Sequence, residues 1–145
     1  MATTATKRLL HTLLHRIIQL IVALSGLAYA QAGAALLLAP AWFFQHIGHF
    51  PPYNQHYEGD LGSFLLALGV GLLFAVGDPT RHRLVVRIAA LGSLLHVGNH
   101  IYAALLKTAP PDEWTREIVP LLVFAVLLTA LSFYREKAPQ QDYSR

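Results

Sequence analysis

Two histidines one helical turn apart interrupt an apolar stretch of the sequence. His96 and His100 lie within LHVGNH at 95–100. Residues four apart share one face of a helix, so both imidazoles can reach the same ligand. Imidazole and carboxylate together are typical ligands of divalent metals. Asp60, on another predicted helix, supplies the carboxylate, and the pattern predicts a metal site formed by His96, His100 and Asp60.

Further polar side chains border this predicted pocket. Asn99 adds an amide beside the two histidines, whereas Glu58 can join only if its helix begins after it. His46, His49 and His56 precede Asp60 and can complete a coordination shell or line an entrance to it. Val97 occupies the place of the glutamate in the zinc-protease motif, so that chemistry is not indicated. The full candidate pocket comprises Asp60, His96, Asn99, His100, Glu58 and His56.

Three interpretations of the pocket stay open. In the structural one, Asp60 caps its helix and hydrogen-bonds His100, while His96 meets a backbone carbonyl or a serine. In the second, the same residues hold a divalent metal, and in the third they bind a quinone, a lipid or another apolar ligand. Haem is disfavoured, because two histidines on one helix face cannot take opposite sides of a porphyrin.

The composition places these residues in a membrane protein. Of the 145 residues, 54% are hydrophobic and only 13% are charged, and the mean hydropathy is +0.44. The sequence contains no cysteine, which excludes disulfides, iron–sulfur clusters and thiol chemistry. The net charge of +3 does not indicate nucleic acid, because the basic residues lie beside the apolar segments.

Four apolar segments are long enough to cross a bilayer, whose core needs roughly 20 residues of helix. They cover 17–39, 58–76, 84–106 and 118–134. The connector 40–57 is rich in aromatic residues and is predicted to lie in the outer headgroup region. The sequence therefore predicts an all-α integral membrane four-helix bundle, one domain over 1–145.

The basic residues predict the orientation, since cytoplasmic flanks collect lysine and arginine. Nine of the eleven fall on one side of the predicted bundle: Lys7, Arg8, Arg16, Arg81, Arg83, Arg87, Arg135, Lys137 and Arg145. Lys107 and Arg116 fall on the other side, with five acids: Glu58, Asp60, Asp112, Glu113 and Glu117. Both termini are therefore expected in the cytoplasm.

The first apolar segment also imitates a secretory signal peptide, with small-residue patterns around Ala30. Against cleavage, the apolar run continues to Pro40 and makes a full span. We expect this helix to be retained.

Small residues predict where the helices pack, because they let backbones approach in a membrane. They lie at Gly26, Ala30, Gly33 and Ala34, at Gly62, Gly69 and Gly71, and at Ala89, Ala90, Gly92 and Ser93. The fourth span carries mostly large aliphatic residues and is expected to face lipid or a partner. Gln19 is expected to bond between helices, and Arg87 to reach the cytoplasmic phosphates.

The segments YNQHYEGDLGSF at 53–64, LHVGNH at 95–100 and LLLAP at 36–40 give the chain a family resemblance. It resembles small bacterial four-helix membrane proteins of the DoxX-like type. The resemblance implies the four-helix layout, and some such proteins are linked to thiosulfate or quinone redox chemistry. It implies no role for individual residues.

Together these features favour a noncatalytic role. A bundle of this size suits an accessory or self-associating subunit of the inner membrane, as a homo-oligomer or in a larger complex. The alternative is a membrane redox protein, or one that binds a divalent metal or quinone through the outer His/Asp site. A transporter ranks third, because no span has a midspan break.

Overall fold

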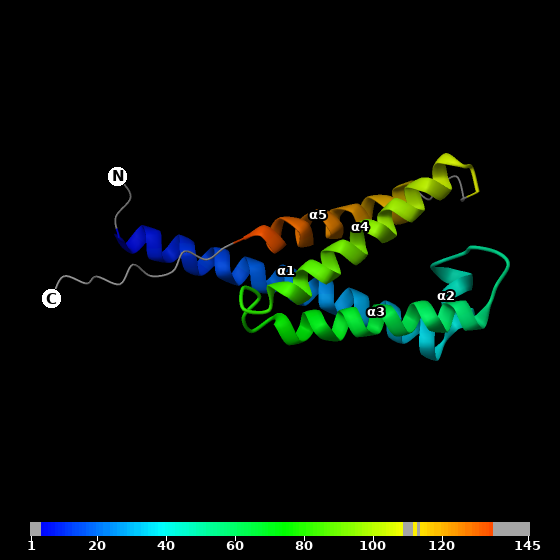
Figure 1. Cartoon of the computed structure of the whole chain (residues 1–145), viewed down its shortest axis with the longest axis horizontal. Coiled ribbons are helices and arrows are strands. Elements are labelled where there is room, and N and C mark those ends of the chain that lie inside the picture. Colours follow the sequence, from blue (N-terminus) through cyan, green and yellow to red (C-terminus); the bar gives the residue numbers. More distant parts are fainter. Residues whose placement is uncertain (1–3, 109–111, 113, 135–145) are drawn as a thin grey trace.

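The computed structural model describes residues 4–108, 112 and 114–134, and this part of the chain is all-helical. Its long helices are α1 (Thr4–Leu38), α3 (Gln55–Ala75), α4 (Arg83–Leu105) and α5 (Val119–Phe133). A short α2 (Pro40–His46) follows α1, and a π-helical turn, η1 (Trp114–Ile118), leads into α5. Counting η1 with α5, four helices are long and apolar enough to span a membrane (Figure 1). The predicted all-helical layout with four long apolar helices is confirmed.

All four long helices begin earlier than the apolar runs predicted, and the starts of α1 and α3 have a local cause in the sequence. α1 starts at Thr4 and not at Ile17, because leucines and polar residues in its lead-in alternate with a helical period. α3 starts at Gln55 because Asn54 caps it: the Asn54 side chain accepts hydrogen bonds from the His56 and Tyr57 backbone N–H groups. Pro40 ends α1 and opens α2, as a proline at the first helical position does.

α1 and α3 pack closely through glycines. A Cβ atom added to Gly33 would lie 2.3 Å from the Leu66 backbone nitrogen, and one added to Gly69 would lie 2.3 Å from the Ala30 backbone nitrogen. Neither distance leaves room for a side chain. The small residues predicted to let the first two spans approach therefore do so.

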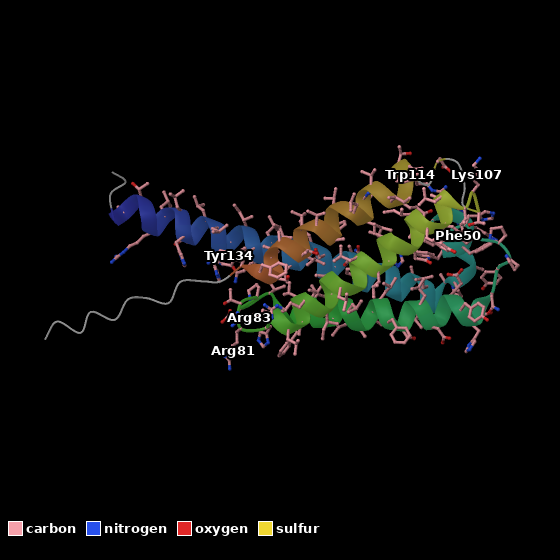
Figure 2. The ribbon with its side chains drawn as sticks, turned by 45° about the horizontal axis from the view of Figure 1, so that its top comes forward. Phe50, Arg81, Arg83, Lys107, Trp114 and Tyr134 are labelled. Atoms are coloured by element: carbon pink, nitrogen blue, oxygen red, sulfur yellow. The ribbon has the colours of Figure 1, made fainter. Side chains whose placement is uncertain are left out.

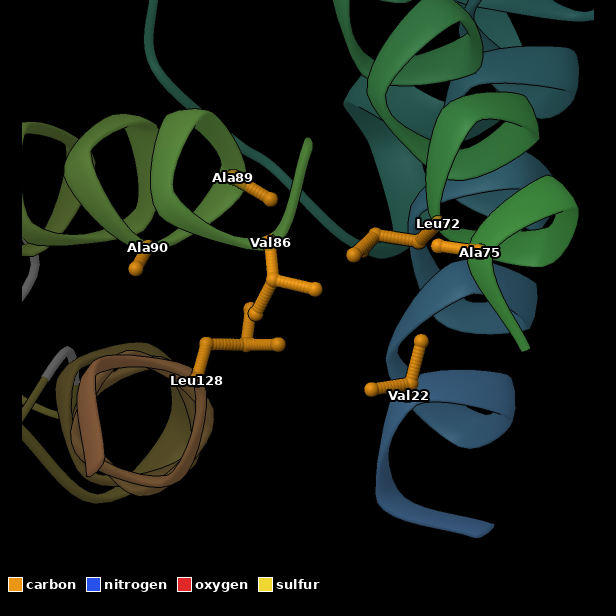
Figure 3. Packing of buried hydrophobic residues seen from close by; sticks show 7 residues of the cluster. All are labelled: Val22, Leu72, Ala75, Val86, Ala89, Ala90 and Leu128. Carbon is orange, nitrogen blue, oxygen red and sulfur yellow. The ribbon is translucent and has the colours of Figure 1, made fainter. Parts of the chain in front are cut away.

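α4 and α5 form the second pair, and the core lies where the two pairs meet. Val22 of α1 and Leu72 of α3 pack with Val86 of α4 and Leu128 of α5, all almost completely buried (Figure 3). Large aliphatic side chains of α5 away from this contact are exposed, including Val123 and Val126. The outward aliphatic face predicted for the fourth span is present.

The two ends of the bundle differ in chemistry (Figure 2). Arg81, Arg83 and Tyr134 lie at one end, which we call the basic end, and Phe50, Lys107 and Trp114 lie at the other, the aromatic end. The core described above is near the basic end, since Ala75 ends α3 there. From the core the two helix pairs diverge toward the aromatic end (Figure 1).

Polar contacts join the helices both between the two pairs and within the second pair. Gln19 Nε2 of α1 donates to the Gly77 carbonyl at 3.0 Å, so the predicted interhelical bond of Gln19 is made to the α3–α4 turn. The Tyr29 hydroxyl of α1 hydrogen-bonds the Ser93 hydroxyl of α4, and Ser93 donates to the Ala89 carbonyl. Arg87 Nε donates to the Ser132 carbonyl at 3.3 Å. Its charge thus lies at the C-terminus of α5, where the helix dipole favours a cation.

Candidate functional site

The two histidines of α4 contact each other directly. His96 Nε2 and His100 Nε2 are 3.1 Å apart, and their ring centroids are 4.8 Å apart. His100 is buried, with 8% of its surface exposed, and His96 is half-buried. A single N–H fits between the two nitrogens, so one ring donates and the other accepts.

A carboxylate lies on the other side of the His100 ring. Glu117 Oε2 is 3.7 Å from His100 Nδ1, and the two side chains are only 15% and 10% exposed. Glu117 belongs to η1, the wide turn before α5. Pro120 has no N–H to offer the Arg116 carbonyl four residues earlier, so this carbonyl lacks its α-helical partner and the turn is free to widen.

An arginine completes the outer side of the cluster. Arg116 Nη2 is 3.0 Å from Glu117 Oε1, and Arg116 Nη1 is 3.5 Å from Asp112 Oδ2. The order of contacts is therefore Asp112, Arg116, Glu117, His100 and His96. Because Arg116 is exposed while Glu117 is largely buried, the cluster leads from the molecular surface into the space between α4 and η1.

An aromatic residue from the connector contacts the His100 ring. The Phe50 ring meets the His100 ring edge-on, with centroids 5.6 Å apart. The connector is held by its own aromatic contacts, since Phe44 is buried against His49 at 4.7 Å and Tyr53 at 5.2 Å between centroids. The segment between α2 and α3 thus reaches across to α4 and links the two helix pairs at the aromatic end.

Asp60 lies elsewhere, at the surface of α3. Its Oδ2 is 3.6 Å from His56 Nε2, and the two side chains are 59% and 82% exposed. The helix begins at Gln55, so Asp60 is in its second turn, one turn after His56, and Asn54 is the cap. The structural interpretation had given the capping role and the bond to His100 to Asp60; Asn54 and Glu117 occupy those positions.

The other predicted residues do not join the histidine pair. Asn99 is exposed on α4, and Glu58 is half-buried in the first turn of α3. His46 hydrogen-bonds the Trp42 carbonyl and stacks on the Trp42 ring. Within residues 4–108, 112 and 114–134, no group of three or more His, Asp or Glu side chains is placed to hold a metal ion.

Sequence reasoning did not select four residues of this cluster, Asp112, Arg116, Glu117 and Phe50, and the two that touch His100 are Glu117 and Phe50. Glu117 had been counted only among the outer acids. A signal was present, since Glu117 lies directly before the fourth apolar run and the connector after α4 is short. In such a hairpin the start of one helix lies beside the end of the preceding one, which brings Glu117 to the level of His100. Phe50 carried no comparable signal.

The arrangement has a defined chemical capacity. The Glu117 carboxylate is too far from His100 Nδ1 for a hydrogen bond, at 3.7 Å, but its charge favours a hydrogen at that nitrogen, which leaves His100 Nε2 with a lone pair. His96 Nε2 then donates the N–H between the two rings. If His96 carries its hydrogen at Nδ1 instead, the two Nε2 atoms can share one hydrogen-bond donor or one electrophile. The described residues supply two ligands of this kind and one orienting carboxylate.

Comparison with known proteins adds no relative: no family model, no curated protein and no solved structure matches this chain. The resemblance to DoxX-like proteins therefore stays a prediction.

Proposed function

We propose that the protein is a multi-pass protein of the plasma or inner membrane, with both termini in the cytoplasm. Four apolar helices support the insertion, and the positions of the charged residues support the orientation. Arg81 and Arg83 lie at the basic end, while Lys107 lies at the aromatic end (Figure 2). Other residues used for the predicted topology lie outside the described part of the chain: the Lys7 side chain, Glu113, Arg135, Lys137 and Arg145.

Within that membrane we propose the role of a self-associating or accessory subunit. The observation that carries this is the part of α1 beyond the other helices (Figure 1). Gln19 is level with the α3–α4 turn, and none of the described side chains before Ile18 is buried. At 1.5 Å per residue, the helix before Ile18 extends about 20 Å past the bundle.

This projecting part of α1 has an exposed apolar face. Leu9, Leu10, Leu13 and Leu14 are between 42% and 61% exposed. A hydrocarbon core about 30 Å thick is already crossed by roughly 20 residues, so the bilayer that holds the bundle leaves these leucines outside. An apolar helix face beyond the membrane calls for a protein surface to cover it.

The test is the mass and composition of the purified protein. The full chain is extracted in mild detergent, reconstituted in nanodiscs, and its mass is measured by light scattering with the lipid contribution subtracted. We expect a homo-oligomer or a stoichiometric complex with another membrane protein. A monodisperse monomer without a partner, in both detergent and nanodiscs, would overturn the role.

A second candidate function is binding of a divalent metal or a quinone at the outer site. The specific observation that favours it is the 3.1 Å approach of two histidine Nε2 atoms beside Glu117, under the Phe50 ring. Metal content and the visible absorption spectrum are measured on one sample of the wild type and of a variant with both His96→Ala and His100→Ala. His56→Ala, which removes an exposed histidine of α3, is the matched control.

Stoichiometric metal or a chromophore that is lost only in the double variant would support this candidate. A folded wild type without either, after exposure to zinc and to a ubiquinone analogue, would exclude it.

A further inference from the structure

The uncovered face of α1 carries a heptad repeat. Large aliphatic residues follow one another at alternating spacings of three and four: Leu10, Leu13, Ile17, Leu20, Leu24 and Leu27. In heptad notation Leu10, Ile17 and Leu24 occupy a positions, and the other three occupy d positions. A sustained repeat of this kind is the pattern of a left-handed coiled coil, in which a and d residues meet the partner helix.

The rest of the bundle leaves this face free. All six side chains are between 47% and 58% exposed. The opposite face of α1 is the one that packs inside the molecule, where Ile18, Val22 and Ser25 are buried. α1 therefore uses one face for the bundle and keeps the heptad face along most of its length, from the projection into the membrane-spanning part.

The chemistry of the repeat points to a second copy of this chain as the partner. A seam with a period of 3.5 residues requires a partner with the same period, and α1 itself supplies one. Two copies inserted in one membrane share one orientation, so their α1 helices run parallel and a two-fold axis along the membrane normal relates them. Gln31 continues the repeat at the next a position and is exposed. Paired across a dimer axis, two Gln31 side chains can hydrogen-bond and fix the register.

The area is sufficient for a stable contact. Six aliphatic side chains, each about half exposed, represent roughly 500 Å² per copy and about 1,000 Å² for the pair, which reaches the size at which specific interfaces begin. Polar residues at b, c and f, including Arg8, Thr12 and His15, stay on the outside of such a pair. The heptad face thus has both the length and the amphipathic pattern of a dimer seam.

We propose that the protein forms a parallel homodimer through an α1–α1 coiled coil, with Leu10, Leu13, Ile17, Leu20, Leu24 and Leu27 in the seam. This inference rests on the proposed self-associating role and names its partner and its surface. The dimer places the two bundles on opposite sides of the seam, so each copy keeps its own α1–α3 contact and its own His96–His100 pair.

The absence of cysteine from the sequence makes a direct test possible. Single variants Leu13→Cys and Leu20→Cys place a thiol at d positions, and Thr12→Cys and His15→Cys place one on the outer face as matched controls. Val126→Cys, on the exposed face of α5, reports on a different interface. Membranes from cells that express each full-length variant are oxidised with copper phenanthroline, and dimers are measured on non-reducing gels.

We expect disulfide dimers at positions 13 and 20 to form about tenfold faster than at 12 and 15, because the bond needs Cβ atoms within about 4.5 Å. Equal rates at all positions, or crosslinks at position 126 alone, would overturn the α1 seam while leaving self-association in place. Crosslinks from position 13 to another protein would overturn the second copy as partner and keep the accessory role. No crosslinks together with a monomeric mass in nanodiscs would overturn both.

Discussion

Gly69 of α3 tests the closest helix contact in the molecule. Gly69→Ala adds one methyl group whose carbon would lie 2.3 Å from the Ala30 nitrogen and 2.7 Å from the Ala30 Cα atom. Ordinary van der Waals contact begins at 3.4 Å, so α1 and α3 would have to separate by about 1 Å at this point. Both close atoms belong to the backbone, and no side chain can turn away to make room.

Two opposing contributions set the expected change in the free energy of unfolding of Gly69→Ala. Overpacking a well-packed contact costs about 1–3 kcal/mol, whereas alanine in place of a helical glycine gains about 0.5–1 kcal/mol. Gly98 of α4 isolates the second term, because a Cβ atom there meets nothing within 4 Å. The propensity gain is common to both variants and cancels, so Gly69→Ala should be less stable than Gly98→Ala by the overpacking term, about 1–3 kcal/mol, or roughly 3–10 °C in Tm.

The assay is thermal unfolding in one detergent, followed by helical circular dichroism and by loss of monodispersity. Wild type, Gly69→Ala and Gly98→Ala are compared at equal protein and detergent concentrations. A Gly69→Ala protein as stable as Gly98→Ala would refute the reasoning, because it would mean that α1 and α3 do not approach as closely as the glycines allow.

Three further measurements test polar contacts. The backbone N–H of Arg81 and the hydroxyl of Thr80 hold the pKa of Asp78 below its ordinary value. The ionised Asp78 therefore stabilises the folded state at neutral pH, and this stabilisation is lost as the pH falls below the ordinary pKa and through the lowered one. Tm should drop between about pH 6 and about pH 3 by more in the wild type than in Asp78→Asn, and equal drops would contradict this. Glu117→Gln, in the buried cluster, should cost about 1 kcal/mol in thermal unfolding, whereas Asp60→Asn, in an exposed pair, should cost almost nothing. Arg87→Met, which keeps the aliphatic stem, should cost about 0.5–1 kcal/mol at the α5 C-terminus, and a Tm equal to that of wild type would show that this bond does not stabilise α5.

The sequence predicts much of this fold because a membrane imposes simple rules. The apolar runs mark the four long apolar helices, since a helix that crosses a membrane must have a fixed minimum length. Gly33 and Gly69 mark the contact of α1 with α3, since only small residues let two backbones approach. The start of α1 at Thr4 was missed because span prediction looks for uniform apolarity, while its first turns are amphipathic.

The candidate site was harder to predict because it depends on helix rotation and not on composition. His96 and His100 are fixed on one face by their spacing, so their contact follows from the sequence. The carboxylate beside them depends on which helix faces α4 at that height. The hydropathy pattern does not specify which helix faces α4, and Asp60 and Glu117 are both acids near one end of a long apolar helix.

The position of the core near the basic end has a mechanical consequence. Val86 of α4 and Leu128 of α5 pack against Val22 and Leu72 of the first pair close to the α3–α4 turn, and we infer that the two helix pairs pivot there. The Tyr29–Ser93 hydrogen bond extends the joined region along α4, which continues for about 18 Å beyond Ser93, so a rotation of about 5° moves its far end by roughly 1.5 Å. The contact between Phe50 and His100 lies about 10 Å beyond Ser93 along α4 and links the two helix pairs where they diverge. We therefore expect a ligand or neighbouring chain that displaces Phe50 to change the angle between the two pairs.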